Sequence, residues 1–239
     1  MNVPVPNNEN ERLAALKEYR ILDTEAEQTY DDIIALAAHI CHVPMAMISL
    51  VDEARQWFKS KMGMERRETP REVAFCAHAI LQREPFIVPD TKKDRRFSGN
   101  TLVTSEPHVR FYAGFPLIAS QGLAMGTLCV KDRKPRRLSP KQKQAMQLLA
   151  RQAMALLESR RVSRNLAEAL EHVKMLQGLL PICAWCKRVR DDDGYWDQVE
   201  AYFHKNTGVD FTHGICPECL EKMRPKVNAN VQRLQPRRG

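Results

Sequence analysis

The sequence predicts an α+β fold, in which an antiparallel sheet with helices packed on one face is followed by a long connecting helix and a small cysteine-rich module. Three observations predict it. Strand-like apolar segments joined by turn residues alternate with helix-like segments through the first 160 residues. A helix-start pattern at 139–142 opens a stretch that runs to residue 177 without a further Gly or Pro. Two Cys-x-x-Cys pairs lie in the last quarter of the chain.

The first half of the sheet domain is expected to contain two helices and a hairpin. Residues 9–20 and 30–42 carry apolar side chains at helical spacing, and Pro44 closes the second pattern. The apolar run 45–51 predicts a buried strand, and we expect 55–61 to be its hairpin partner.

The second half is expected to contain a helix, a short strand, a second hairpin and the long helix. Residues 74–81 have helical spacing, and 86–88 form a short apolar strand. The segments 109–118 and 124–130 are joined by a Gln-Gly turn signal, which predicts a hairpin. Ser139 is followed by proline and, three residues after the serine, by glutamine, a pattern typical of a helix N-terminus.

Composition indicates a soluble globular protein. With 239 residues, 44% hydrophobic and 28% charged, the chain can form one full core and a smaller module. The first residues lack a basic segment followed by an apolar one, and no apolar run approaches the ~20 residues of a membrane helix. We therefore expect a cytoplasmic protein without membrane contact, in which paired cysteines hold metal or do redox chemistry more often than they form disulfides.

The net charge of +8 does not come from one strongly basic block. The densest basic clusters, 92–96 and 131–137, fall in expected loops. A solvated loop is the favoured interpretation of each cluster, and contact with an anion or a nucleic acid is the alternative.

Six segments of the sequence resemble the GAF domain, and they follow the order of that family through about residues 9–160. The segments are 11–23, 48–52, 55–60, 71–80, 111–117 and 126–130. The resemblance implies a sensory domain with a five- or six-stranded antiparallel sheet, which in various relatives binds small molecules or serves as a dimerisation platform. It names no particular ligand.

The resemblance also implies where a ligand pocket would lie, between a helix and a strand of the domain. The candidate lining residues are Phe75, Cys76, His78, Phe111 and Tyr112. The alternative is that these side chains belong to the core. Some relatives attach a bilin through a cysteine that directly precedes a histidine; here Ala77 intervenes, so a packed helix is favoured. Cys41 and Cys129 fall on core positions and are expected to be inert.

The end of the long helix carries apolar residues at alternating spacings of four and three. The positions are Val162, Leu166, Ala169, Val173, Leu176 and Leu180. This seam predicts a parallel homodimer that forms through a coiled coil. One amphipathic helix packed on its own domain is the alternative.

The terminal cysteines predict a structural zinc site. Each pair, with two residues between its sulfurs, can turn both thiolates toward one ion, and 29 residues separate the pairs. A module with so few apolar residues also needs a bound metal ion or another cross-link in order to fold. The proposed ligands are Cys183, Cys186, Cys216 and Cys219. A dithiol redox switch and unligated cysteines are the alternatives, and His213 could replace one thiolate.

The cysteine-rich segment also resembles an extension found after sensory and receiver domains in bacterial signalling proteins. The expected organisation is a flexible tail 1–8, the GAF-like domain 9–160, a helical linker 161–180, the zinc module 181–224 and a basic tail 225–239.

No phosphate-binding loop, G-x-S-x-G, H-E-x-x-H or kinase motif set occurs in the sequence. We therefore expect a non-enzymatic signalling protein that contacts an unidentified protein partner, with a ligand biasing the exit helices of the dimer. The alternatives are nucleic-acid binding through the module and the basic tail, and a redox-responsive regulator that uses the paired thiols.

Overall fold

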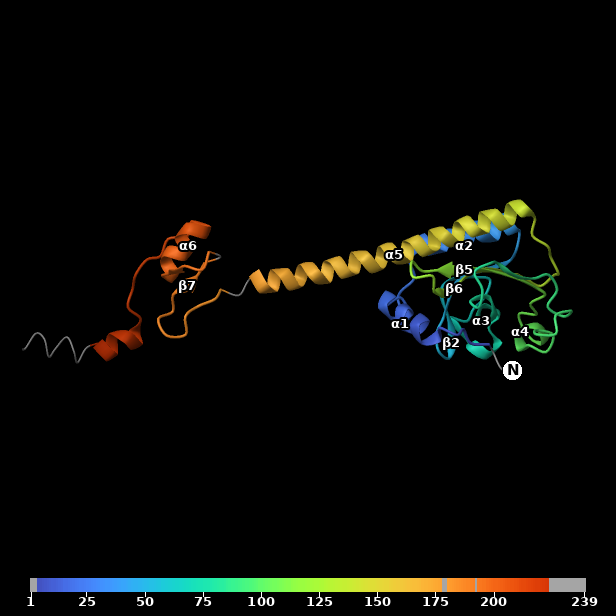
Figure 1. Cartoon of the computed structure of the whole chain (residues 1–239), viewed down its shortest axis with the longest axis horizontal. Coiled ribbons are helices and arrows are strands. Elements are labelled where there is room, and N and C mark those ends of the chain that lie inside the picture. Colours follow the sequence, from blue (N-terminus) through green and yellow to red (C-terminus); the bar gives the residue numbers. More distant parts are fainter. Residues whose placement is uncertain (1–3, 178–179, 192, 224–239) are drawn as a thin grey trace, which may run out of the picture. The chain divides into compact units, whose positions relative to one another are not determined.

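A computed structural model describes residues 4–177, 180–191 and 193–223. The chain divides into two compact units, residues 1–169 and 170–239, and each is described by itself (Figure 1). No helix among the described residues is both long and apolar enough to span a membrane.

The helices and strands of the first unit occur in the order expected from the sequence, with two short additions besides a 3-10 turn. In chain order they are α1 (Glu9–Tyr19), α2 (Gln28–Cys41), β1 (Met45–Val51), β2 (Arg55–Met62), β3 (Glu68–Pro70), a 3-10 turn (Arg71–Val73), α3 (Phe75–Ala79), β4 (Phe86–Val88), α4 (Thr101–Thr104), β5 (Phe111–Ile118), β6 (Ala124–Asp132) and α5 (Pro140–Gln177). The additions are β3 and α4.

A six-stranded antiparallel sheet in the order β3-β2-β1-β6-β5-β4 forms the middle of the first unit. The central strands β1 and β6 are buried along their whole length. The predicted α+β class with an antiparallel sheet and a long helix is therefore confirmed.

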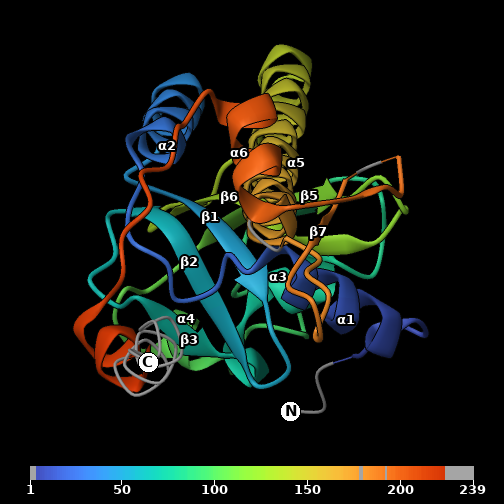
Figure 2. The same cartoon turned by 90° about the vertical axis from the view of Figure 1, so that its left-hand side faces the viewer.

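Helices cover both faces of the sheet rather than one. Ile48 and Leu50 of β1 join a core formed with α1, α2 and α5, whereas Met45 and Met47 join a second core formed with α3 and α4. Figures 1 and 2 show α2 and α5 on one face and α3 on the other. The expectation of helices on one face is wrong because the central strands are buried on both sides, and helices cover each side.

The predicted start of the long helix is confirmed in atomic detail. The backbone N–H of Gln142 donates to Ser139 Oγ at 3.2 Å, and the backbone N–H of Ser139 donates to Gln142 Oε1 at 2.9 Å. This reciprocal capping box satisfies two backbone donors that the helix leaves free. The amide of Gln142 also donates to the carbonyl of Ile40 at 2.9 Å, which ties α5 to the end of α2.

The second unit is small and has little core. Its elements are β7 (Val189–Arg190), β8 (Trp196–Asp197) and α6 (Val199–Thr207), together with the end of α5 and the helical residues 217–223. Among its described residues, Val189 is the one buried side chain. The predicted basic tail lies outside the described residues.

Candidate functional site

The structure brings four of the five predicted pocket residues to one side of the sheet. They are Phe75, Cys76, His78 and Tyr112. The rings of Phe75 and Tyr112 stack with centroids 5.0 Å apart. Burial and the charge of Arg96 lower the pKa of His78, which favours the neutral ring.

Phe111 does not belong to this group. It lies in the other core, with α1, α2 and α5. Successive residues of a strand point to opposite faces, so Phe111 and Tyr112 of β5 line different sides of the sheet.

The sulfur of Cys76 is surrounded by polar side chains in the interior between α3 and the sheet. The Cys76 side chain is fully buried, at 0% exposure. Four side-chain atoms lie within hydrogen-bonding distance of its sulfur: Ser49 Oγ (3.2 Å), Gln56 Nε2 (3.2 Å), Tyr112 Oη (3.2 Å) and Thr127 Oγ1 (3.0 Å). These four residues come from β1, β2, β5 and β6, so the sheet itself fixes their positions.

A second thiol and a buried ammonium group complete this arrangement. Cys129 Sγ lies 3.8 Å from Cys76 Sγ. Lys131 is 1% exposed, and its Nζ lies 5.9 Å from the ring centre of Phe75 and 6.0 Å from that of Phe58. We call the set around Cys76 the Cys76 cluster: Ser49, Gln56, Cys76, Tyr112, Thr127, Cys129 and Lys131.

Sequence reasoning missed five of the seven members of the Cys76 cluster, among them Cys129 and Lys131. Cys129 was expected to be inert, and Lys131 was assigned to a solvated basic loop. The structure places both on β6, where alternate side chains point toward α3. The alternation of Thr127, Cys129 and Lys131 along one strand was the available signal.

The cluster favours a negative charge on the Cys76 sulfur. Burial alone would raise the pKa of Cys76, but the thiol of Cys129, the charge of Lys131 and the hydroxyls of Ser49 and Thr127 lower it well below its ordinary value. The hydrogen bond to Cys76 and burial raise the pKa of Cys129. The two pKa shifts have opposite directions, so the pair favours one thiolate beside one thiol.

Two buried oxygens beside the cluster have no hydrogen-bond partner among the described residues. They are Gln56 Oε1 and Thr69 Oγ1, and their residues pair across β2 and β3. Buried polar atoms are usually satisfied by protein, water or ligand. These two oxygens are therefore the places in this interior where a polar group of a bound molecule would gain hydrogen bonds.

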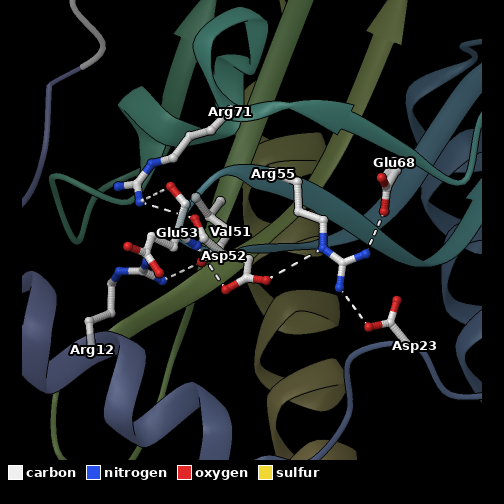
Figure 3. A network of polar contacts seen from close by, with 8 residues as sticks. All are labelled: Arg12, Asp23, Val51, Asp52, Glu53, Arg55, Glu68 and Arg71. Carbon is white, nitrogen blue, oxygen red and sulfur yellow. Dashed lines mark hydrogen bonds and ion pairs between the residues drawn. The ribbon is translucent and has the colours of Figure 1, made fainter.

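A network of charged residues holds the segment that leads into α3. Arg12 Nη1 donates to the carbonyl oxygen of Val51 at 2.6 Å, and Arg71 Nη1 donates to that of Asp52 at 3.0 Å (Figure 3). Both guanidinium groups also donate to Glu9 Oε1, at 2.7 Å from Arg12 and 2.5 Å from Arg71. Burial raises the pKa of Glu9, but the two arginines lower it more strongly, to about 2. The network fastens α1 to the β1–β2 turn.

Arg55 forms a second branch of this network on β2. Its guanidinium contacts Asp52 at 3.4 Å, Glu68 at 2.5 Å and Asp23 at 2.6 Å (Figure 3). These contacts join β3 and the loop after α1 to the β1–β2 turn. Their role is structural.

The four terminal cysteines, which are the predicted zinc ligands, are not gathered at one point in this structure. Cys183 is partly exposed, and Cys186, Cys216 and Cys219 are exposed. Among the described residues, no three His, Cys, Asp or Glu side chains lie close enough together to hold a metal ion. The module has little core to draw its two pairs together, since α6 contributes no buried residue.

One relative of known activity is the cyclic di-GMP phosphodiesterase PA2567 of Pseudomonas aeruginosa. It is 39% identical over 166 residues, which cover 69% of this chain and 28% of that enzyme. The chain therefore matches little more than a quarter of the relative's length. This finding overturns the expectation of a non-enzymatic protein, because the relative is an enzyme. The motif sets that were absent from the sequence belong to other enzyme classes, so their absence did not exclude this one.

One solved structure shows the same fold, and a second is reported for comparison alone. The GAF domain of a phosphoenolpyruvate-protein phosphotransferase from Coxiella burnetii has a TM-score of 0.50 and 13% identity, covering 66% of this chain and 97% of that one. The blue-light-absorbing form of the PixJ GAF domain from Thermosynechococcus elongatus has a TM-score of 0.49 and 15% identity, covering 71% and 98%.

The family model of the GAF domain matches residues 25–157, which is more than half of the chain. The matched range runs from just before α2 to the buried part of α5, and it contains the whole sheet and the Cys76 cluster. The order of elements, the six-stranded antiparallel sheet and this match agree, and the chain belongs to the GAF domain family.

Proposed function

We propose that this chain is a sensory protein of cyclic di-GMP turnover, in which the GAF domain receives a signal and controls the hydrolysis of cyclic di-GMP. The 39% identity to a cyclic di-GMP phosphodiesterase through the GAF part supports the link to this nucleotide. The observation that carries the sensory role is the Cys76 cluster, a buried and chemically specific group of side chains in the interior of the domain.

The strand β6 supplies a physical route from this interior to the exit helix. Cys129 faces α3, whereas its neighbours Leu128 and Val130 lie in the opposite core. That opposite core contains Met146 and Ala153 of α5. Because packed cores resist compression, a displacement of β6 at the Cys76 cluster shifts the surface on which α5 lies.

A small polar ligand would bind where the interior leaves polar atoms without partners. Gln56 Oε1 would accept a hydrogen bond from such a molecule, and the Thr69 hydroxyl would donate or accept one. Phe75 and Tyr112 would pack against its apolar part. A ligand that bound only one arrangement of the domain would shift the population toward that arrangement.

The exit helix supports a proposal of dimerisation. Val162 and Leu166 are 57% and 59% exposed on α5, and Ala169 is exposed as well. The side chains of Val173 and Leu176 lie outside the described residues. A parallel homodimer would bury this seam against its copy.

The terminal cysteines support a proposal of zinc binding. The two C-x-x-C pairs would have to approach one another to supply four thiolates, and the ion would then stabilise a module whose own core is too small. Zinc would be structural there, with no open coordination position.

Measurement of cyclic di-GMP tests the proposed function. Purified full chain is incubated with cyclic di-GMP and divalent cations, and linear product is followed by liquid chromatography. In parallel, the nucleotide is quantified in bacteria that express the chain or its Thr127→Val variant. We expect lower cyclic di-GMP with the chain, and a different level with the variant. Unchanged nucleotide in cells together with no hydrolysis or binding in vitro would overturn the link to cyclic di-GMP.

A further inference from the structure

Cys76 and Cys129 face each other across the interior between α3 and β6. Their sulfurs are 3.8 Å apart, and both side chains are fully buried. We propose that these two residues form a redox-active dithiol, which reacts with small hydroperoxides and closes to a disulfide. The proposal concerns the chemistry of the site and does not depend on the link to cyclic di-GMP.

The surroundings of Cys76 make it the attacking sulfur. Thiolates, not thiols, are the nucleophiles in this chemistry. Two hydroxyls, those of Ser49 and Thr127, and the amide of Gln56 lie 3.0–3.2 Å from the Cys76 sulfur, and the ammonium of Lys131 is buried nearby. Among the described residues, no ion pair joins Lys131 Nζ to a carboxylate, and its charge lowers the pKa of Cys76, so a thiolate at Cys76 would balance the buried ammonium.

The first step is a two-electron oxidation of Cys76. The thiolate attacks one oxygen of the hydroperoxide, an S–O bond forms and the O–O bond breaks. The leaving alkoxide or hydroxide takes up a proton and departs as alcohol or water. Cys76 becomes a sulfenic acid, and the peroxide is reduced.

The second step uses Cys129. Its sulfur attacks Cys76 Sγ, an S–S bond forms and the S–O bond breaks, and the released hydroxide takes the Cys129 proton and leaves as water. In sum, two thiols and one hydroperoxide give one disulfide, one alcohol or water from the peroxide, and one further water. A disulfide bond is about 2.05 Å long, so the sulfurs must approach by roughly 1.8 Å, which side-chain rotation and a small shift of α3 can supply.

Closing the disulfide removes the charge that organises the cluster. Tyr112 and Gln56 lose the thiolate that accepts their hydrogen bonds, and Lys131 loses the negative charge that balances it. The oxidised domain therefore has to rearrange around β6, which is the strand that also contacts the core of α5. A dithiol reductant restores the starting state.

Mapping the cysteines of the intact protein tests the proposal. Full-length protein is reduced, freed of reductant and treated with hydrogen peroxide; it is then denatured, alkylated with N-ethylmaleimide, digested and analysed by mass spectrometry. We expect a linked peptide pair containing Cys76 and Cys129, two hydrogen atoms lighter than the free peptides. Cys41 is the internal control, because burial raises its pKa to about 11. Cys76 should be lost at least about tenfold faster than Cys41.

Two variants distinguish the roles of the sulfurs. In Cys129→Ser, the sulfenic acid of Cys76 has no partner and should be trapped by dimedone. In Cys76→Ser, Cys129 should remain fully alkylated. The cysteine mapping of the wild-type protein does not depend on whether either variant folds. Recovery of Cys76 and Cys129 as alkylated thiols at peroxide concentrations that oxidise Cys41 or the four terminal cysteines would overturn the proposal, as would linkage of Cys76 to any other cysteine.

Discussion

Ser49 and Thr127 lie directly opposite each other on β1 and β6, and their hydroxyl oxygens are 3.1 Å apart. Both oxygens are also within 3.2 Å of the Cys76 sulfur. The pairing of the two central strands therefore fixes the positions of the two hydroxyl groups that contact the Cys76 sulfur. Because Ser49 pairs with Thr127 in the register of β1 with β6, these two hydroxyls come together whenever the two strands pair in this register.

Replacing Thr127 with valine should destabilise the domain. The substitution keeps the shape of the side chain and removes a hydroxyl that contacts Cys76, so we expect the free energy of unfolding to fall by about 1–2 kcal/mol. Thr69→Val is the matched control, because the Thr69 hydroxyl has no partner among the described residues and its loss should cost at most about 0.5 kcal/mol. Urea denaturation measures both, and equal losses would contradict the expectation.

The thiolate of Cys76 should make stability rise with pH. Because the pKa of Cys76 is lower in the folded protein than its ordinary value of 9.0, the unfolded chain binds more protons between these two values. This contribution is fully present above pH 9 and is lost as pH falls through the folded pKa. Denaturation between pH 6 and 9 should show a steeper rise for the wild type than for Cys76→Ser. Parallel curves would argue against a buried thiolate.

Glu9 should contribute stability that acid removes. Its pKa falls from 4.5 to about 2 in the folded protein, so its contribution is complete above pH 4.5 and is lost as pH falls toward 2. At pH 7, Glu9→Gln should lower the free energy of unfolding by about 1–2 kcal/mol, less than the full shift because solvent partly screens the site. Glu11→Gln, on the exposed face of α1, is the control. The difference between the two variants should shrink below pH 4.5.

The seam on α5 should be needed for dimerisation. Size-exclusion chromatography with light scattering should give twice the chain mass of 27.5 kDa. Placing like charges on the seam with Val162→Glu and Leu166→Glu should give a monomer, whereas Ala167→Glu, outside the seam, should leave the dimer intact. A monomeric wild type would refute the dimer.

The terminal cysteines should bind one zinc ion per chain. Elemental analysis and native mass spectrometry of protein purified without chelators should detect it, and a chelator should unfold residues 181–224 while leaving the GAF domain folded. Cys186→Ser and Cys216→Ser, one from each pair, should each reduce zinc content, whereas Cys41→Ser should not. If protein purified without chelators contained no zinc, the proposed zinc site would be refuted.

The sequence predicts the main elements of the GAF domain because their local signals are strong. β1 and β4 have the bounds expected from their apolar runs, and the capping box at Ser139 forms as predicted. β3 and α4 escape prediction because elements of three or four residues draw their stability from neighbours, such as the pairing of β3 with β2, rather than from their own sequence.

The candidate site is harder to predict than the fold. Cys76 can be recognised from its helix, but the strand pattern cannot say which apolar side chains of β5 face α3, because both faces of that strand are buried. This is why Phe111 was assigned to the wrong side. Lys131 was placed in a loop with the basic cluster 131–137, whereas the structure buries it on β6, which is rare for a lysine.

Alternate side chains of β6 lie in opposite cores of the domain, so the residues on one side of the strand can be substituted while those on the other side stay the same. Substitutions at positions 127, 129 and 131 would alter what the interior beneath α3 recognises, while Leu128 and Val130 continue to support α5. New sensory specificities could therefore accumulate on one side of a single strand without disturbing the attachment of the helix on the other.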